Sequence, residues 1–176
     1  MSCVKKYKAD LVRYGGKIPL SEPWLRKFHY YLRKVQTETR LIPRMIYRAL
    51  FRSVKQKHGI EISYAVKIGG GLYLGHPYNI TINDAAVIGE NCNLHRGVLI
   101  GQENRGARKG APKIGNCVWI GVNATIVGNV EIGDDVLIAP NTFVNCDVPP
   151  HSIVFGNPCI IKHKENATEG YINNKA

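Results

Sequence analysis

Aliphatic residues recur at every sixth position from residue 62 onward, and this repeat constrains the fold more than any other feature of the chain. The repeated position is occupied by Ile62, Ile68, Leu74, Ile80, Ile82, Ile88, Leu94, Ile100, Ile114, Ile120, Ile126, Ile132, Ile138 and Val144. A period of six is neither the 3.6 of an α-helix nor the 2 of a β-strand. It is the signature of a parallel β-helix, in which three short faces form one coil of a triangular prism and neighbouring coils pair through their backbones. The sequence therefore predicts a mainly β fold.

The repeat is interrupted twice. Two extra residues separate Ile80 from Ile82 in register, and eight extra residues lie between Ile100 and Ile114. Inserted residues cannot fit inside a packed prism, so we expect the longer insertion, residues 102–113, to leave a corner as an extruded loop. Loops on a rigid scaffold often carry function, although a passive loop is the alternative.

Residues 1–60 have a helical pattern instead. Ser21 is a candidate N-cap, and Glu22 and Pro23 would occupy the first turn. Two apolar stripes at helical spacing follow, the first comprising Trp24, Phe28, Tyr31, Leu32 and Val35, and the second Ile42, Met45, Ile46, Ala49, Leu50 and Val54. The second stripe has Arg44, Arg48, Arg52 and Lys55 opposite it, so the sequence predicts a basic amphipathic helix.

The net charge of +11 comes entirely from this N-terminal third, where 15 Lys and Arg face 3 Asp and Glu, against 9 and 10 in the rest of the chain. Such a segment could pack on the main body with its basic face in water, or contact an acidic surface such as the inner face of a membrane. No nucleic-acid-binding motif accompanies the charge, so we expect no nucleic acid partner. No apolar run is long enough to span a membrane and no secretory signal is present, which predicts a cytoplasmic protein with possible peripheral membrane contact.

Five cysteines at irregular spacing, without a C-x-x-C pair, predict reduced thiols that mostly fill small spaces in the core. The repeat region before the loop offers only two histidines, and they are not closely spaced. Because a catalytic zinc site usually takes three protein ligands, no metal is expected.

Residues 61–160 resemble the serine O-acetyltransferases and the related capsular and lipopolysaccharide sugar O-acetyltransferases. The stretches that carry the resemblance are "KIGGGLYLGHPYNITINDAAVIGENC", "HRGVLIG", "APKIGNCVWIGVNATIVGNVEIGDDVLIAPNTFV" and "VPPHSIVFGNPCII". The resemblance implies a left-handed parallel β-helix acyltransferase domain at 61–160, after a basic helical segment at 1–60 and before a tail at 161–176. It also implies acetyl-CoA as co-substrate and a homotrimer with the active site between subunits.

The resemblance places the catalytic histidine of the family at His76, in "LGHPYNI", and its carboxylate partner at Glu61, where the family usually has aspartate. A neutral imidazole is well suited to take a proton from a hydroxyl, and a carboxylate on its other nitrogen fixes the tautomer. His95 is an alternative base or a contact for the acceptor, and His76 could also be a packed structural residue. Tyr78 and Arg96 are further candidates for the acceptor side. The remaining histidines, His29, His58, His151 and His163, are expected at the surface.

Acetyl-CoA is expected along a groove outside the later coils. The matching positions are Gly121, Val122, Pro140, Lys162 and Lys164, with the backbone of Gly101 as a candidate for stabilising the oxyanion. In the extruded loop, Arg105 and Arg108 could meet an anionic sugar or the coenzyme phosphates. The alternatives are that the first set only shapes the coils and that the loop is only solvated.

Three departures from the serine enzymes concern the acceptor. Gly75 stands where they have an aspartate, and Gly110 and Ala111 stand where they have an Arg-His pair. We therefore expect the same chemistry on a different hydroxyl, that of a sugar in a surface-polysaccharide precursor. Serine O-acetylation, N-acetylation of a nucleotide amino sugar, and a non-catalytic trimeric scaffold remain the alternatives. For an acetyltransferase, the trimer that the resemblance implies means that His76 should meet the extruded loop of another chain.

Overall fold

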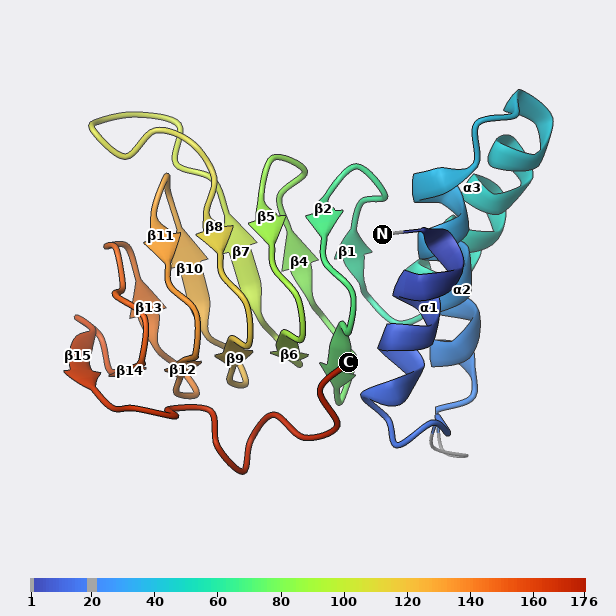
Figure 1. Ribbon diagram of the computed structural model, residues 1–176. Coiled ribbons are helices and arrows are strands. Elements are labelled where there is room, and N and C mark those ends of the chain that lie inside the picture. The colour runs from blue at the N-terminus through green and yellow to red at the C-terminus, as the bar shows by residue number, and fades with distance from the viewer. Residues whose placement is uncertain (1, 19–21) are drawn as a thin grey trace.

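A computed structural model describes residues 2–18 and 22–176, which form three helices followed by fifteen short strands (Figure 1). The helices are α1 (Cys3–Val12), α2 (Trp24–Thr37) and α3 (Leu41–Gln56). The strands are β1 (Glu61–Ile62), β2 (Lys67–Ile68), β3 (Tyr73–Gly75), β4 (Thr81–Ile82), β5 (Val87–Ile88), β6 (Asn93–His95), β7 (Leu99–Gly101), β8 (Lys113–Ile114), β9 (Trp119–Ile120), β10 (Thr125–Val127), β11 (Glu131–Ile132), β12 (Val136–Ile138), β13 (Phe143–Val144), β14 (Ser152–Phe155) and β15 (Ile160–His163).

The strands form three sheets, which are the three faces of a prism. Sheet A contains β1-β4-β7-β10-β13, sheet B contains β2-β5-β8-β11, and sheet C contains β3-β6-β9-β12-β14-β15. Within each sheet the neighbours are parallel, except that β15 runs antiparallel to β14. The chain visits A, B and C in turn and returns to A one coil later. This is a parallel β-helix of about five turns, so the predicted fold class is confirmed.

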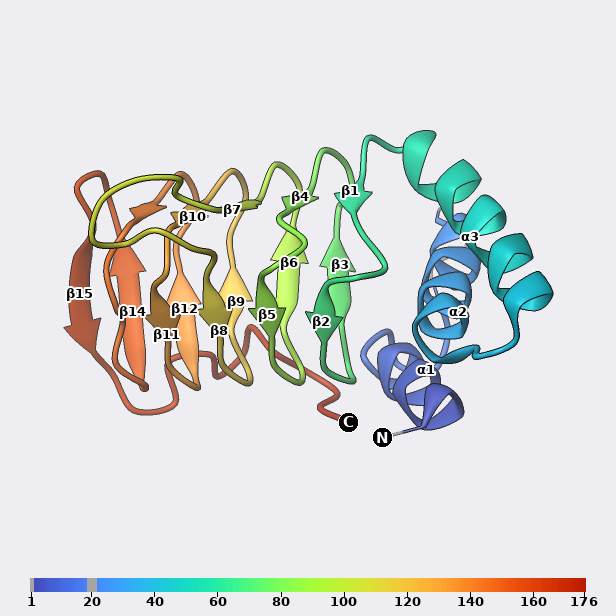
Figure 2. The ribbon, with the colours of Figure 1, turned by 90° about the horizontal axis from the view of Figure 1, so that it is seen from above.

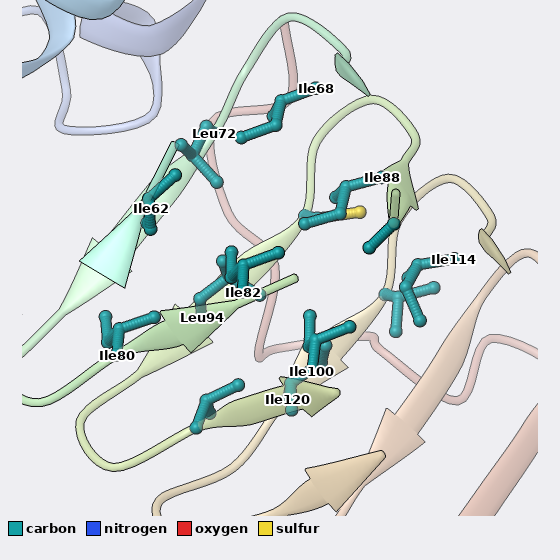
Figure 3. Close-up of a cluster of buried hydrophobic side chains, with 14 of the residues drawn as sticks. Ile62, Ile68, Leu72, Ile80, Ile82, Ile88, Leu94, Ile100, Ile114 and Ile120 are labelled. Carbon is teal, nitrogen blue, oxygen red and sulfur yellow. The ribbon is translucent and has the colours of Figure 1, made fainter. Parts of the chain in front are cut away.

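The repeated aliphatic residues fill the interior of the prism. All fourteen predicted positions are at most 4% exposed. Figure 3 shows side chains from Ile62 to Ile120 in successive coils stacking on one another. Burying one such side chain contributes about 1.5–3 kcal/mol. The six-residue period thus sets which side chains face inward, and the stacked coils form one continuous core.

The two interruptions of the repeat lie at different corners. Glu61 pairs with Thr81, 20 residues later, whereas Thr81 pairs with Leu99 only 18 residues later, so the short insertion lies between β3 and β4. The extruded loop leaves between β7 and β8 and projects over the later coils (Figure 1). Backbone hydrogen bonds between Glu103 and Gly110 close it into a hairpin.

The three helices cover the open edge of the first coil, where β1, β2 and β3 have no preceding strand (Figures 1 and 2). Unpaired backbone groups at a sheet edge need partners, and side chains supply them here. Arg33 donates to the carbonyl oxygens of Ile68 (2.9 Å) and Gly69 (2.6 Å), and Asp10 accepts from the amide of Leu72 (2.9 Å). Further bonds run from Lys6 to Ile68, from Arg13 to Gly71, from Gln36 to Val66 and from Lys55 to Ile62. Part of the basic N-terminal charge therefore closes the β-helix rather than facing an acidic partner.

The helices differ from the sequence expectation in two ways. The predicted N-cap Ser21 lies outside the described residues, and α2 begins at Trp24. Its apolar stripe packs as predicted, with Phe28 and Leu32 fully buried. The second apolar stripe does not, because α3 packs on the protein through Phe51 and leaves most of that stripe in solvent. None of the described helices is long and apolar enough to cross a bilayer.

The expected surface position of His29 is wrong. Its side chain is fully buried, with Nε2 3.1 Å from the Tyr14 hydroxyl and Nδ1 3.4 Å from the Asp10 carboxylate. It was misassigned because Asp10 and Tyr14 lie in the preceding, separate segment of chain. The cysteines are free as predicted, but only Cys92 is buried, so they are not mostly core residues.

The C-terminal tail runs back along the prism from β15 to the first coil (Figure 1). The Asp135 carboxylate accepts hydrogen bonds from the amides of Ala167 (2.9 Å) and Thr168 (3.0 Å) and from the Thr168 hydroxyl. Farther along, Asn93 donates to the carbonyl oxygen of Tyr171. The tail therefore lies along the prism beside sheet C, held by side chains from β6 and from the residue just before β12.

Candidate active site

His76 lies on a bulge at the corner between sheets C and A. The amide of Arg96 bonds to the carbonyl of Gly75 (3.1 Å), and the amide of Gly97 bonds to that of Tyr78 (3.1 Å). Between these two bonds the second coil advances by one residue and the first coil by three, so two residues of the first coil bulge outward. His76 takes a left-handed φ of 49°, which is uncommon outside glycine, and its side chain is exposed. The short insertion thus lifts an imidazole off the prism, where it can reach a substrate.

Glu61 lies on the outer face of sheet A, beside Thr81, just after the same corner. Its side chain is exposed. No hydrogen bond or ion pair joins Glu61 to His76, although both residues are among those described. The structure therefore brings the two residues to one corner, and their direct pairing stays a prediction.

His95 fills the space beside Gly75. The two residues pair in register between β3 and β6, and a Cβ atom added at Gly75 would collide with the His95 ring. That ring lies 4.7 Å from Trp119 between centroids, and its Nε2 is buried without a hydrogen-bond partner in the described part of the chain. Burial, with a smaller contribution from His76, lowers the pKa of His95 to about 4. His95 is therefore a neutral, half-buried imidazole that occupies the space of a side chain at position 75, where the serine enzymes are expected to have an aspartate.

We predict that Gly75→Asp destabilises the protein, because the new side chain and the His95 ring require the same space. Overpacking of this kind costs about 1–3 kcal/mol. The additional substitution His95→Gly should restore most of the loss by removing the ring. Urea unfolding of the two variants and the wild type measures this, and equal stability of Gly75→Asp and the wild type would contradict it.

The candidate coenzyme residues fall into three groups. Gly121 and Pro140 stack in neighbouring coils at the corner between sheets C and A, and the carbonyl of Val122 accepts from the amide of Asn141 there (2.9 Å). These residues continue the row that His76 begins. Gly101, in contrast, ends β7 on the far side of sheet A.

The two candidate lysines lie in the region of the last strand, β15. Both side chains are exposed, and the Lys162 ammonium lies 5.7 Å from the ring centroid of Phe155. The amide of Lys164 bonds to the carbonyl of His151, which precedes β14 at the corner where the chain enters sheet C. The structure therefore does not bring Lys164 to the corner of Gly121 and Pro140.

The candidate acceptor residues are also separated. Tyr78 is 39% exposed beside His76, and Arg96 is exposed in the next coil. Arg105 and Arg108 lie in the extruded loop, where Arg108 pairs with Asp147 at 3.4 Å. That loop leaves the corner between sheets A and B, which is not the corner of His76. Within one chain, the loop and the histidine belong to different corners.

An aromatic stack beside the bulge was not foreseen. The rings of Trp24 and His58 are stacked with centroids 3.6 Å apart, and both lie near the Tyr78 ring, at 6.3 and 5.7 Å. The sequence places Trp24 in an apolar helical stripe and predicts His58 at the surface, and no spacing along the chain links the two residues. Helix α2 therefore contributes an aromatic ring beside Tyr78, two residues after His76 in the chain. The described residues include no cluster of three or more His, Cys, Asp or Glu side chains arranged to hold a metal.

Comparison with known proteins gives a consistent result. The family described as "Bacterial transferase hexapeptide (six repeats)" matches residues 111–146. Serine acetyltransferase 2 of Arabidopsis thaliana is 37% identical over 110 residues, which are 62% of this chain and 34% of that protein. Serine acetyltransferase of Helicobacter pylori is 35% identical over 112 residues, which are 64% of this chain and 66% of that protein. The chain is a hexapeptide-repeat protein related to the serine acetyltransferases.

Solved structures extend this relationship beyond the repeat. The soybean serine acetyltransferase apoenzyme superposes with a TM-score of 0.74 at 28% identity, covering 92% of this chain and 69% of that one. The enzyme of Neisseria gonorrhoeae in complex with serine gives a TM-score of 0.71 at 28% identity and covers 91% and 69%. This hexapeptide-repeat protein thus shares its arrangement, helices included, with serine acetyltransferases. It spans only about a third of the length of the plant relatives that it matches in sequence.

Proposed function

We propose that the protein is an acetyl-CoA-dependent O-acetyltransferase. The observation that carries this proposal is the exposed imidazole of His76 at the head of the corner row that leads to Gly121 and Pro140. The named relatives are all acetyltransferases, which supports the same chemistry. Acetyl-CoA would lie along the row, held mainly by backbone groups of the stacked corners.

In this proposal His76 is the general base. It takes the proton of the acceptor hydroxyl as the hydroxyl oxygen forms a bond to the acetyl carbon. The carbon–sulfur bond of the thioester then breaks, and the proton returns to the departing thiolate, so the products are an ester and a thiol. His95, whose pKa is about 4, remains neutral near pH 7 and cannot serve this cycle as effectively. Glu61 would orient His76, either directly or through a water molecule.

We further propose a homotrimer, as the resemblance implies. The reason within this chain is that the extruded loop and His76 lie at different corners. A neighbouring chain packed against sheet A could bring its own loop, with Arg105 and Arg108, to the His76 of this chain. The site would then lie between subunits.

Serine is the acceptor that the comparisons favour, since the matching relatives and structures are serine acetyltransferases. The sugar acceptor expected from the sequence has no support among them. One observation keeps a sugar hydroxyl, at a membrane-bound precursor, as the second candidate. The place of the expected aspartate is taken by the uncharged His95 ring, so a carboxylate for the serine ammonium group is missing there.

An acceptor screen decides between these candidates. The full chain is incubated with acetyl-CoA and either L-serine, UDP-sugars or oligosaccharides, and thiol release is followed. Thiol release that depends on L-serine and not on the sugars supports serine O-acetylation. Thiol release that depends on a sugar and not on L-serine supports a sugar acceptor. If no hydroxyl compound accelerates release above acetyl-CoA hydrolysis, the O-acetyltransferase proposal fails and a scaffold role remains.

A further inference from the structure

Helix α3 exposes an apolar stripe that the protein itself does not cover. Leu41, Ile42, Met45 and Ile46 are 73%, 71%, 59% and 55% exposed, and Leu50 continues the stripe at 39%. The spacing puts these residues on one side of a 16-residue helix, about 24 Å long. The opposite side holds Phe51, which is buried against α2 and the first coil. The helix is amphipathic, but its apolar side faces outward.

The charge around this stripe has one sign. Helix α3 contains Arg44, Arg48, Arg52 and Lys55 and has no acidic residue. None of the three arginines forms an ion pair with any carboxylate among the described residues. The nearest acidic side chain in sequence, Glu38, already accepts three hydrogen bonds from Arg40, two of them from the guanidinium. Arg48 lies over the ring of Tyr64 at 4.7 Å, on the flank of the stripe.

We infer that α3 is a membrane-contact helix that lies on an anionic lipid surface. An exposed apolar stripe flanked by arginines is the pattern of helices that insert one face at the boundary between headgroups and acyl chains. A second copy of the same stripe fits less well, because pairing would bring two sets of unpaired arginines together. Anionic headgroups would neutralise those charges and the acyl chains would cover the stripe.

The position of α3 permits this contact. Figures 1 and 2 show it as the outermost helix at one end of the molecule, with the extruded loop and β15 at the other end. A membrane at this end would leave the later coils and the extruded loop accessible. The inference does not depend on the acetyltransferase activity, and either one can fail without the other.

Vesicle sedimentation of the full chain tests the inference. Vesicles of phosphatidylcholine with 30% phosphatidylglycerol are compared with pure phosphatidylcholine, in low and high salt. The matched variants are Ile46→Glu and Ile160→Glu, since the two isoleucines are 55% and 53% exposed and lie at opposite ends of the protein. We expect at least tenfold tighter binding to the anionic vesicles, a loss of at least tenfold in Ile46→Glu, and no loss in Ile160→Glu.

Several results would overturn the inference. Equal binding of the wild type to both kinds of vesicle would contradict the preference for an anionic surface. An equal loss of binding in both variants would show that the stripe does not contact lipid. Sedimentation velocity without lipid adds a second readout. If Ile46→Glu lowers the oligomeric state and the wild type binds neither kind of vesicle, the stripe is an interface between copies of the chain. Thiol release with a soluble acceptor should stay unchanged in Ile46→Glu, which separates this test from that of the proposed activity.

Discussion

Replacing His76 with alanine is expected to lower the rate of acetyl transfer on the order of 10²–10⁴-fold, the contribution of a positioned general base. The imidazole is exposed on a two-residue bulge and forms no hydrogen bond or ion pair with another described residue, so its removal should leave the fold intact. Thiol release from acetyl-CoA with the acceptor found in the screen measures the effect. The melting temperature of the variant should match that of the wild type.

His163→Ala is the matched control, because that imidazole is also exposed but lies in β15, at the far end of the prism. It should retain the wild-type rate. The pH dependence adds a second check. An acid limb of kcat/KM near pH 4 would assign the base to His95, whose pKa lies there, and would contradict the role given to His76.

The β-helix was predictable because its rule is local. Each repeat places Ile100 or Ile126 inward by the same six-residue spacing, whatever the rest of the chain does. The helical segment follows no such rule. Its apolar stripes at Phe28 and Met45 look alike in sequence, yet one is buried and the other exposed. Which stripe packs inward depends on where the edge of the first coil lies, and the spacing of residues within a helix does not contain that information.

The candidate site was predictable in part for the same reason. The register of the repeat places His76, Gly121 and Pro140 along one corner. Contacts between a helix and a corner, such as Trp24 against His58, depend on tertiary packing and were missed. The sequence shows that Gly75 stands where the resemblance implies an aspartate. Only the structure shows that the His95 ring of the next coil occupies the space beside it.

Replacing Arg33 with methionine is expected to destabilise the protein by about 3–5 kcal/mol, because it leaves a buried carboxylate without its partner. Arg33 and Asp10 are both fully buried and form two hydrogen bonds of 2.8 and 2.9 Å. The substitution also removes the donors for the carbonyls of Ile68 and Gly69 at the open edge of β2. Urea unfolding followed by circular dichroism measures the change.

Arg26→Met is the control for this prediction, since Arg26 is an exposed arginine of the same helix and its loss should cost less than about 0.5 kcal/mol.

The pH dependence of stability separates the contribution of charge from that of packing. Burial alone would raise the pKa of Asp10, but Arg33 and His29 bring it below its usual value. The resulting stability is present above the unfolded pKa of about 3.9 and is lost as the pH falls through the folded value. Arg33→Met should lack this acid-side loss, and an equal loss in both proteins would contradict the pairing.

The most direct measurement for the account is the distance between the sulfur atom of bound coenzyme A and the ring of His76 in a crystal of the full chain. General-base catalysis requires the imidazole to reach the reacting hydroxyl within about 2.6–3.2 Å or through one water molecule, with the thioester carbon in contact with that hydroxyl. We predict that the pantetheine arm follows the corner of Gly121 and Pro140 and ends beside His76. A coenzyme bound at another corner, with its sulfur remote from every His76 of the assembly, would contradict the account.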